Sequence, residues 1–231
     1  YKEQMIAVDK RWADIDYWRA LGVMVDPTTA GYYLNAVDLK YNVDKEIVRQ
    51  KENRRIYNKT WIKTFKVSVL VMFFCLILGY PIAYLLSTLP LKYSNLLMIC
   101  VLLPFWTSLL VRTVAWMVML QQKGVFNNLL VMSNIIADEN RFALMYNQTA
   151  TIIVMTQILL PFMVLPLYSV MKTISPNYMR AALNLGASPL HAFWKIYMPN
   201  SVPGISAGCM LVFILAIGYY ITPELVGGKD G

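Results

Sequence analysis

Long apolar runs alternate with short polar segments through most of the chain. Four runs have the length of a membrane-spanning helix, at about 67–88, 95–120, 149–171 and 203–222. Residues 1–60 contain no such run and mix charged with apolar side chains. The pattern therefore predicts a polar domain over residues 1–60, followed by a membrane domain over residues 61–231.

Shorter periodicities predict a small α+β domain within residues 1–60. Helical spacing of apolar residues over 12–21 predicts one helix, and Asp26-Pro27-Thr28 predicts the cap of a second. Alternating apolar residues over 37–43 predict a strand, which can form a hairpin with Ile47 and Val48. A domain of this size buries only a modest core, so we expect it to lean on the membrane domain or on a partner.

Prolines and polar residues interrupt the predicted spans. In the second run, Pro104 removes a backbone hydrogen bond and Arg112 places a charge among apolar residues. Pro161 and Pro166 interrupt the third run. Because lipid offers no hydrogen bonds to freed backbone groups, we expect these positions to face protein or water.

Two other segments suggest how the helices are arranged. Gly204 and Gly208 in the fourth run form a small-x-x-x-small step, which predicts close contact with a neighbouring helix. Residues 121–147 have one apolar side that includes Phe126 and Leu129. This side fits either a helix lying in the membrane interface or an ordinary packed loop helix.

A polar insert, residues 175–199, separates the third and fourth runs. Ser175-Pro176 and Ser188-Pro189 each combine an N-cap with a first-turn proline, so the insert should form two short helices. Gly186 supplies the backbone freedom that ends the first helix, and we expect Pro199 to end the second. Apolar residues recur at helical spacing in both, as Tyr178, Ala181, Ala182 and Leu185, and as Leu190, Phe193, Trp194 and Tyr197.

Composition supports a membrane protein and disfavours an enzyme. The chain has 231 residues, of which 58% are hydrophobic and 15% charged. Its three cysteines lie inside apolar runs, so they predict neither disulfides nor a metal centre. The spans contain no paired carboxylates and no nucleophile with a base, and the chain has no glycine-rich phosphate loop. We therefore expect no catalytic residues, no metal and no cofactor bound by this chain.

The insert and its flanking motifs resemble a known family. The cytoplasmic loop of permeases from bacterial binding-protein-dependent (type I) ABC importers follows the pattern E-A-A-x3-G-x9-I-x-L-P, and this chain matches it at Ala181, Ala182, Gly186, Ile196 and Pro199. The stretches LPFWTSLLVRTVAW from Leu103, VPGISAG from Val202 and AIGYYITPELVGG from Ala216 are similar to the spermidine/putrescine branch. Two positions depart from the pattern, because Arg180 replaces the acidic residue and Met198 replaces leucine.

The resemblance implies an all-α membrane protein with the type I ABC importer transmembrane fold, and one more span at each end than this sequence contains. It implies a bacterial inner (plasma) membrane protein, with residues 1–60 in the periplasm and the loop 175–199 in the cytoplasm. The implied partners are a cytoplasmic ABC ATPase dimer that binds ATP and Mg, a second permease subunit and a periplasmic solute-binding protein. The implied cargo is a polyamine such as spermidine or putrescine.

The resemblance also assigns candidate site residues. Coupling to the ATPase would use Arg180, Ala181, Ala182, Leu185, Gly186 and Ala187. Polar and aromatic groups available along a substrate path are Trp106, Thr107, Arg112, Trp116, Tyr219, Tyr220, Thr222 and Glu224. Because Arg180 reverses the usual charge, we expect the second permease to be a non-identical subunit that carries the usual acid.

Arg112 leaves the cargo open. A buried cation would repel a polyamine unless Glu224 or helix-end carbonyls neutralise it. It could instead be a structural pin, or the cargo could be an amino-acid-like solute with a carboxylate. Two other functions remain as alternatives: a secondary transporter or channel, which shares broken helices, and a membrane sensor whose inner helix pair reads DNA. The few basic residues in the insert argue against the sensor.

Overall fold

The computed structural model describes residues 2–25, 30–42, 46–52 and 55–228. The chain divides into two compact units, Tyr1–Phe65 and Lys66–Gly231. The long helix α4 (Tyr57–Thr88) begins in the first unit and belongs for most of its length to the second.

The first unit combines short helices with a two-stranded antiparallel hairpin. Its elements are α1 (Lys2–Val8), the 3-10 turn η1 (Lys10–Ala13), α2 (Ile15–Val25), α3 (Gly31–Ala36), β1 (Leu39–Tyr41) and β2 (Ile47–Arg49). In the hairpin Lys40 lies opposite Val48, so the predicted pairing is confirmed. Val43 and the segment Asp26–Thr28, for which a strand residue and a cap are predicted, lie outside the described residues.

A carboxylate far away in the sequence caps the beginning of α4. Asp38 is buried and has a left-handed backbone, with φ of 58°. Its two oxygens accept hydrogen bonds from the backbone N–H groups of Tyr57 (3.1 Å) and Asn58 (2.8 Å). A negative charge is favourable at a helix N-terminus, where such N–H groups lack partners within the helix. Asp38 thus fixes the residue at which α4 starts.

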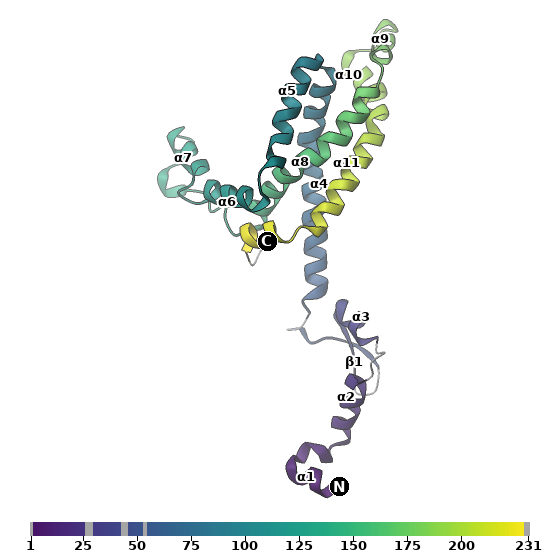
Figure 1. The fold of residues 1–231 in the computed structure, drawn as a ribbon, viewed down its shortest axis with the longest axis vertical. Helices are drawn as coiled ribbons and strands as arrows, with labels where there is room; N and C mark the ends of the chain where they lie inside the picture. Colours follow the sequence, from purple (N-terminus) through teal and green to yellow (C-terminus); the bar gives the residue numbers. More distant parts are fainter. Residues whose placement is uncertain (1, 26–29, 43–45, 53–54, 229–231) are drawn as a thin grey trace. The chain divides into compact units, whose positions relative to one another are not determined.

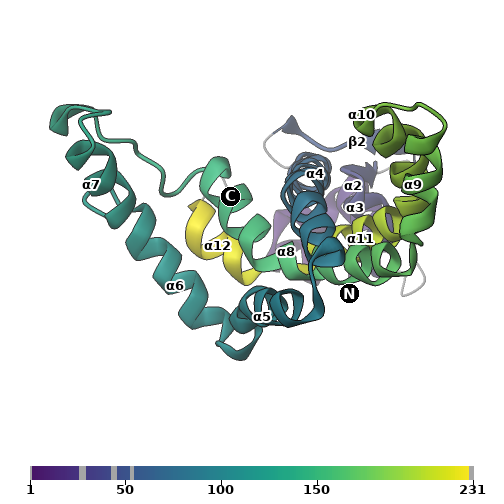
Figure 2. The ribbon, with the colours of Figure 1, turned by 90° about the horizontal axis from the view of Figure 1, so that it is seen from above.

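The second unit consists of helices joined by turns and loops, with no strand among its described residues. After α4 come α5 (Leu91–Leu102), η3 (Leu103–Trp106), α6 (Leu109–Leu120), α7 (Val125–Met132), η4 (Asp138–Asn140), α8 (Gln148–Thr173), α9 (Pro176–Asn184), α10 (Pro189–Ala192), α11 (Met198–Gly218) and α12 (Ile221–Gly227). Helices α4, α5, α8 and α11 run side by side, α9 and α10 lie at one end of this bundle, and α6 and α7 project from it (Figures 1 and 2).

Helix α8 lies at the centre of the packing. Of the most apolar stretch of α8, 61% is buried inside the chain, whereas the corresponding share is 28% in α4 and 28% in the helix Pro189–Gly218 that includes α11. Met163 of α8 is fully buried between two glycines, since a Cβ on Gly79 would lie 2.9 Å from its Cγ and one on Gly208 would lie 2.7 Å from its Sδ. A Cβ on Gly204 would lie 3.3 Å from the Leu167 Cα. The predicted close contact at the glycine step is therefore confirmed.

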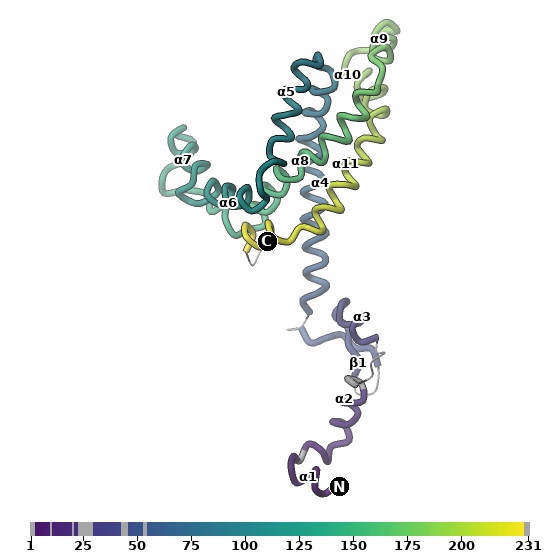
Figure 3. The backbone as a smooth tube through the Cα atoms, in the orientation of Figure 1, coloured from purple at the N-terminus to yellow at the C-terminus, as the bar shows by residue number. Residues whose placement is uncertain are grey.

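Three described helices are long and apolar enough to cross a membrane, namely α4, α8 and the continuous helix Pro189–Gly218. The predicted second span, 95–120, is not one helix. Leu91–Trp106 and Leu109–Met132 meet at an angle of 97°, and count as a fourth span only if taken together (Figure 3). Pro104 lies in the 3-10 turn just before this bend, where its missing N–H interrupts the helix.

The predicted fourth span, 203–222, is also wrong at both ends. The helix starts at Pro189 and ends at Gly218, so Pro199 does not stop it, and Thr222 belongs to α12. Residues Phe193–Tyr197 form a π-helical segment in which Met198 N–H bonds to the Phe193 carbonyl. This wider turn just before Pro199 keeps the proline ring from clashing with a preceding carbonyl, so the helix continues.

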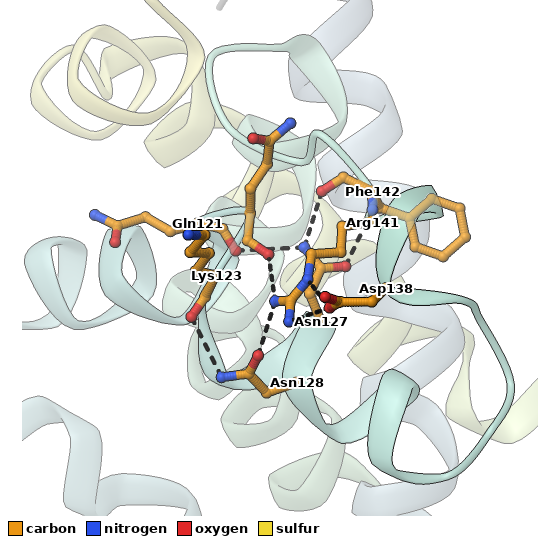
Figure 4. Close-up of polar contacts among 8 residues, drawn as sticks. Gln121, Lys123, Asn127, Asn128, Asp138, Arg141 and Phe142 are labelled. Carbon is orange, nitrogen blue, oxygen red and sulfur yellow. Dashed lines mark hydrogen bonds and ion pairs between the residues drawn. The ribbon is translucent and has the colours of Figure 1, made fainter.

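A polar network folds the segment after α6. Buried Asn127 exchanges two hydrogen bonds with the Phe142 backbone, at 2.9 and 3.1 Å (Figure 4). Arg141 pairs with Asp138 at 2.6 Å and donates to Asn128 Oδ1 at 2.7 Å. The polar side of α7 is thus fixed within the chain, which leaves its apolar side, including Phe126 and Leu129, exposed.

Helix packing at Gly204 can be tested by substitution. Gly204→Val should lower the melting temperature of the detergent-solubilised protein by several degrees, because the added atoms meet the α8 backbone and overpacking costs about 1–3 kcal/mol. Gly218→Val is the matched control, since nothing lies within 4 Å of a Cβ there. Equal melting temperatures for the two variants would contradict the packing described here.

Candidate coupling insert and translocation path

The two short helices of the insert begin where the sequence predicts. The Ser175 hydroxyl accepts a hydrogen bond from the Asn177 N–H, and the Ser188 hydroxyl accepts one from the His191 N–H, each at 3.4 Å. A proline follows each serine in the first turn of the helix. These N-caps satisfy donors that the helices cannot satisfy themselves, so local sequence alone sets both starting points.

Gly186 ends the first helix in a left-handed conformation, with φ of 86°. Its N–H bonds to the Leu183 carbonyl at 3.0 Å, and the Ala187 N–H bonds to the Ala182 carbonyl at 3.1 Å. This pair of bonds is the Schellman motif, which needs a residue with positive φ. Since nothing lies within 4 Å of a Cβ at Gly186, the glycine is required by its backbone and not by space.

Aromatic rings from α4 hold the second half of the insert. The ring of Tyr84 lies edge-on to those of Phe193 (5.5 Å between centroids) and Tyr197 (5.0 Å). Tyr80 meets Phe193 in the same way at 6.1 Å. Such edge-to-face pairs stabilise beyond their buried area, so the π-helical segment is anchored to α4.

Two pairs of hydroxyl groups reinforce this anchor. Tyr80 Oη lies 3.0 Å from Ser201 Oγ, and Ser87 Oγ lies 3.1 Å from Tyr197 Oη. Beside the rings is an open, almost wholly apolar groove of about 360 Å³, lined by Tyr80, Pro81, Tyr84, Pro189, Leu190 and Phe193. The second half of the insert and α11 therefore form one continuous helix, Pro189–Gly218, bound laterally to α4.

The predicted coupling residues divide between a buried and an exposed side. Ala182 is buried and Ala187 half-buried, whereas Arg180, Ala181 and Gly186 are exposed. Leu185 is 88% exposed, so the predicted apolar face of the first helix does not pack as a unit. Leu190 and Trp194 of the second helix are 71% and 56% exposed. The structure thus presents large apolar side chains on an insert whose other side is anchored.

Part of the predicted substrate path comes together where α6, α8 and α12 meet. The hydroxyls of Thr113 and Thr222, both fully buried, lie 3.3 Å apart and join α6 to α12. The indole N–H of Trp116 donates to Gln157 Oε1 of α8 at 3.0 Å. Gln157 is not among the predicted site residues, although a polar residue inside an apolar run was a signal that could have identified it.

Arg112 lies beside this cluster and is held by a backbone carbonyl. Its Nη2 donates to the Thr107 carbonyl at 3.1 Å. Its Nε is buried without a hydrogen-bond partner. Within the described part of the chain, Glu224 is exposed and forms no ion pair with Arg112. Of the two predicted neutralising partners, the helix-end carbonyl is therefore the one present.

Other predicted path residues stay outside the cluster. Trp106 is 90% exposed and Tyr220 is 72% exposed. Sequence reasoning also missed the anchor residues Tyr80, Tyr84, Ser87 and Ser201. The i, i+4 spacing of the two tyrosines was a signal for one helix face, but nothing local indicated its partner.

Comparison with known proteins places these features in a family. Residues 67–231 match the family described as "Binding-protein-dependent transport system inner membrane component". The chain is 37% identical over 173 residues to the "Spermidine/putrescine transport system permease protein PotB" of Escherichia coli (strain K12), which covers 75% of this chain and 62% of that protein.

Two more relatives indicate the breadth of the similarity. The protein of the same name from Haemophilus influenzae is 36% identical, over 75% of this chain and 60% of the relative. The "Molybdenum transport system permease protein ModB" of Mycobacterium bovis is 25% identical, over 74% of this chain and 61% of the relative. The chain thus spans about three fifths of the length of these relatives.

The Schellman turn predicts a position-specific effect at Gly186. Gly186→Val should accelerate amide hydrogen exchange of the two N–H groups that close the turn, those of residues 186 and 187, by roughly tenfold. The reason is that a left-handed backbone costs a β-branched residue about 1–2 kcal/mol. Gly186→Asn should exchange more nearly like the parent, since asparagine tolerates this conformation. Equal exchange in all three proteins would show that the turn does not need positive φ.

Proposed function

Because this chain belongs to the family of binding-protein-dependent transport system inner membrane components, we propose that it is a permease subunit of an ABC importer and forms part of the path for a polyamine. The family match and the similarity to spermidine/putrescine permeases over 173 residues support this proposal. The observation that carries it furthest is the insert, a bent pair of short helices. One side of the insert is anchored on α4 and the other exposes large apolar side chains, and its second helix continues directly into a membrane-length helix.

In this proposal the insert receives mechanical work from a separate ATPase. An ABC ATPase dimer that binds ATP and Mg contacts Arg180, Ala181, Leu185 and their neighbours. Its movement passes through the anchored π-helical segment into α11 and α4 as rigid-body displacement. The lack of a glycine-rich phosphate loop and of a nucleophile-base pair in the sequence is consistent with hydrolysis on a partner.

The direction of the chain through the membrane follows from the insert. If loop 175–199 faces the cytoplasm, then the turn between α4 and α5 does too, because the Lys172 Nζ at the end of α8 donates to the Ser87 carbonyl near the end of α4. The chain then enters α4 from the periplasmic side, which gives residues 1–60 a periplasmic location. A periplasmic solute-binding protein and a second, non-identical permease subunit complete the proposed importer.

The polar cluster of α6, α8 and α12 is the proposed lining of the path. Trp116 and Tyr219 offer aromatic faces that attract amine cations. On α6 and α12 or next to them, Thr107, Thr222, Tyr220 and Glu224 offer oxygen atoms that can accept hydrogen bonds from amine groups. Arg112, held by the Thr107 carbonyl, acts as a structural pin and not as a cargo ligand. A carboxylate-bearing cargo is the alternative that Arg112 favours, because its Nε is buried without a partner.

Reconstituted transport tests the function. The importer is assembled with its ATPase and binding protein in proteoliposomes. It should accumulate labelled putrescine or spermidine only when ATP is present on the side of the membrane that carries the ATPase. Gly186→Val should leave ATP hydrolysis measurable but reduce uptake per ATP several-fold, while Gly186→Asn keeps most of it. Uptake that persists without ATP would instead favour a secondary transporter or channel.

Arg112 separates the two cargo classes. Arg112→Gln should not reduce putrescine uptake, because removing a like charge cannot weaken the binding of a cation. For a carboxylate cargo, the same change should cost about tenfold or more in uptake at limiting concentration, since a hydrogen bond to a charged group contributes about 1.5–3 kcal/mol. Arg112→Lys is the control that keeps the charge. Loss of putrescine uptake in the glutamine variant but not in the lysine variant, with the melting temperatures of both unchanged, would refute the polyamine proposal.

A further inference from the structure

An amide side chain lies inside α8, the membrane-length helix with the largest buried share. Gln157 is half-buried there, although its neighbours Thr156 and Ile158 are buried. A polar side chain within a membrane span is unfavourable unless it is hydrogen-bonded, and residues of this kind are often functional. The hydrogen bonds of this amide therefore indicate what it does.

The partner of the amide is the indole of Trp116 on α6. The indole Nε1–H donates to Gln157 Oε1 at 3.0 Å. Because an indole nitrogen can only donate, it must meet the amide oxygen and not the amide nitrogen. The amide nitrogen has no hydrogen-bond partner among the described residues. Trp116 thus occupies the acceptor that α8 presents to α6.

Gln157 is easier to reach than the hydroxyl pair of the same cluster. Thr113 and Thr222 are fully buried and lie against each other. Gln157 and Trp116 are only half-buried, and Trp116 packs on the outside of the buried apolar cluster that includes Ile158. A solute that enters between α6 and α8 therefore meets the amide before it meets the hydroxyls.

The guanidinium of Arg112 does not occupy this acceptor. Arg112 lies one turn before Trp116 on the same face of α6, from which a long side chain can extend toward either end of the helix. Its Nη2 donates to the Thr107 carbonyl, on the N-terminal side of α6, at 3.1 Å. The Gln157 oxygen is thus left to a neutral donor. An ammonium group is a better donor, because charge-assisted hydrogen bonds are shorter and stronger than neutral ones.

We propose, building on the polyamine cargo proposed above, that Gln157 is a specificity-determining residue whose oxygen is bound alternately by Trp116 and by the cargo. An ammonium group of the polyamine replaces the indole N–H as the donor to Oε1. The amide oxygen stays hydrogen-bonded in both arrangements, so the exchange avoids the cost of an unpaired polar group. Loss of the indole bond also removes a side-chain link between α6 and α8. Cargo binding at Gln157 is therefore tied to the contact between these helices.

Equilibrium binding tests the exchange. The assembled importer, without its solute-binding protein, is purified in neutral detergent and titrated with labelled putrescine, so that binding reports the membrane path alone. Trp116→Phe should lower the Kd about threefold to tenfold, because it keeps an aromatic ring but removes the competing N–H. Gln157→Leu should raise the Kd by about tenfold or more, since the ammonium group loses its acceptor.

A double-mutant cycle separates this role from a structural one. In the Gln157→Leu background, Trp116→Phe should no longer lower the Kd, because no oxygen remains to be freed. Gln157→Glu should bind putrescine at least as well as the parent, since a carboxylate keeps the acceptor and attracts the cation. Trp61→Phe is the matched control. Trp61 is 63% exposed at the start of α4, and the same change of ring there should leave the Kd unchanged.

Tryptophan emission supplies an independent signal. Putrescine should shift the emission of the parent, because the Trp116 indole N–H loses its partner in the chain. The difference spectrum should be absent in Trp116→Phe and present in Trp61→Phe. Melting temperatures check that each variant is folded.

Several results would overturn the exchange. If Trp116→Phe weakens binding, or tightens it equally in the Gln157→Leu background, then the pair is only structural. If succinate displaces putrescine and binds in its place, then the amide nitrogen is the contact and not the oxygen. These results leave the proposed function standing as long as ATP-driven uptake of putrescine persists. If the parent neither takes up nor binds putrescine, the proposed polyamine function fails and the exchange fails with it.

Discussion

Close backbone packing on α8 is the constraint on which the membrane part depends. In lipid, apolar surface gives helices no reason to associate, so contact must come from fit. Gly79 and Gly208 lie on either side of the buried Met163, and Gly204 brings α11 against the α8 backbone near Leu167. Since α8 has prolines 161 and 166 within its length, it also needs neighbours around the freed carbonyls. The glycines let α4 and α11 come near enough to provide that protein environment.

This packing makes the insert a mechanical extension of the bundle. One helix runs from Pro189 to Gly218, so its first residues belong to the insert and its later ones contact α8. The ring and hydroxyl contacts of Tyr80 and Tyr84 with the π-helical segment tie the same helix to α4. The second half of the insert is therefore in contact with two membrane helices at once, α4 and, through α11, α8. The bend at Gly186 has a different role, because its left-handed backbone sets the direction of the first helix, and nothing lies within 4 Å of a Cβ at that position.

Local signals in the sequence predicted the parts that depend on one or two neighbouring residues. The serine-proline caps, the glycine turn and the glycine step all fall into this class. Prediction failed where a distant segment decides the outcome. Pro199 reads as a stop, but the helix continues through the wider turn before it, which packs against Tyr80 and Tyr84 of the distant α4. Asp38 caps a helix that begins at Tyr57, and the hydroxyl pairs join residues more than one hundred positions apart. No single-sequence periodicity contains such pairings.

The candidate path differs from the centre of the bundle in the kind of contact that holds it. Around Met163 the helices meet through small residues, whereas α6, α8 and α12 meet through side-chain hydrogen bonds of Thr113, Thr222, Trp116 and Gln157. A glycine contact loses its fit with a small displacement, but a hydroxyl or amide can exchange one partner for another, including water. Arg112 lies beside these contacts, where the break after η3 supplies the Thr107 carbonyl that a continuous helix would have used itself.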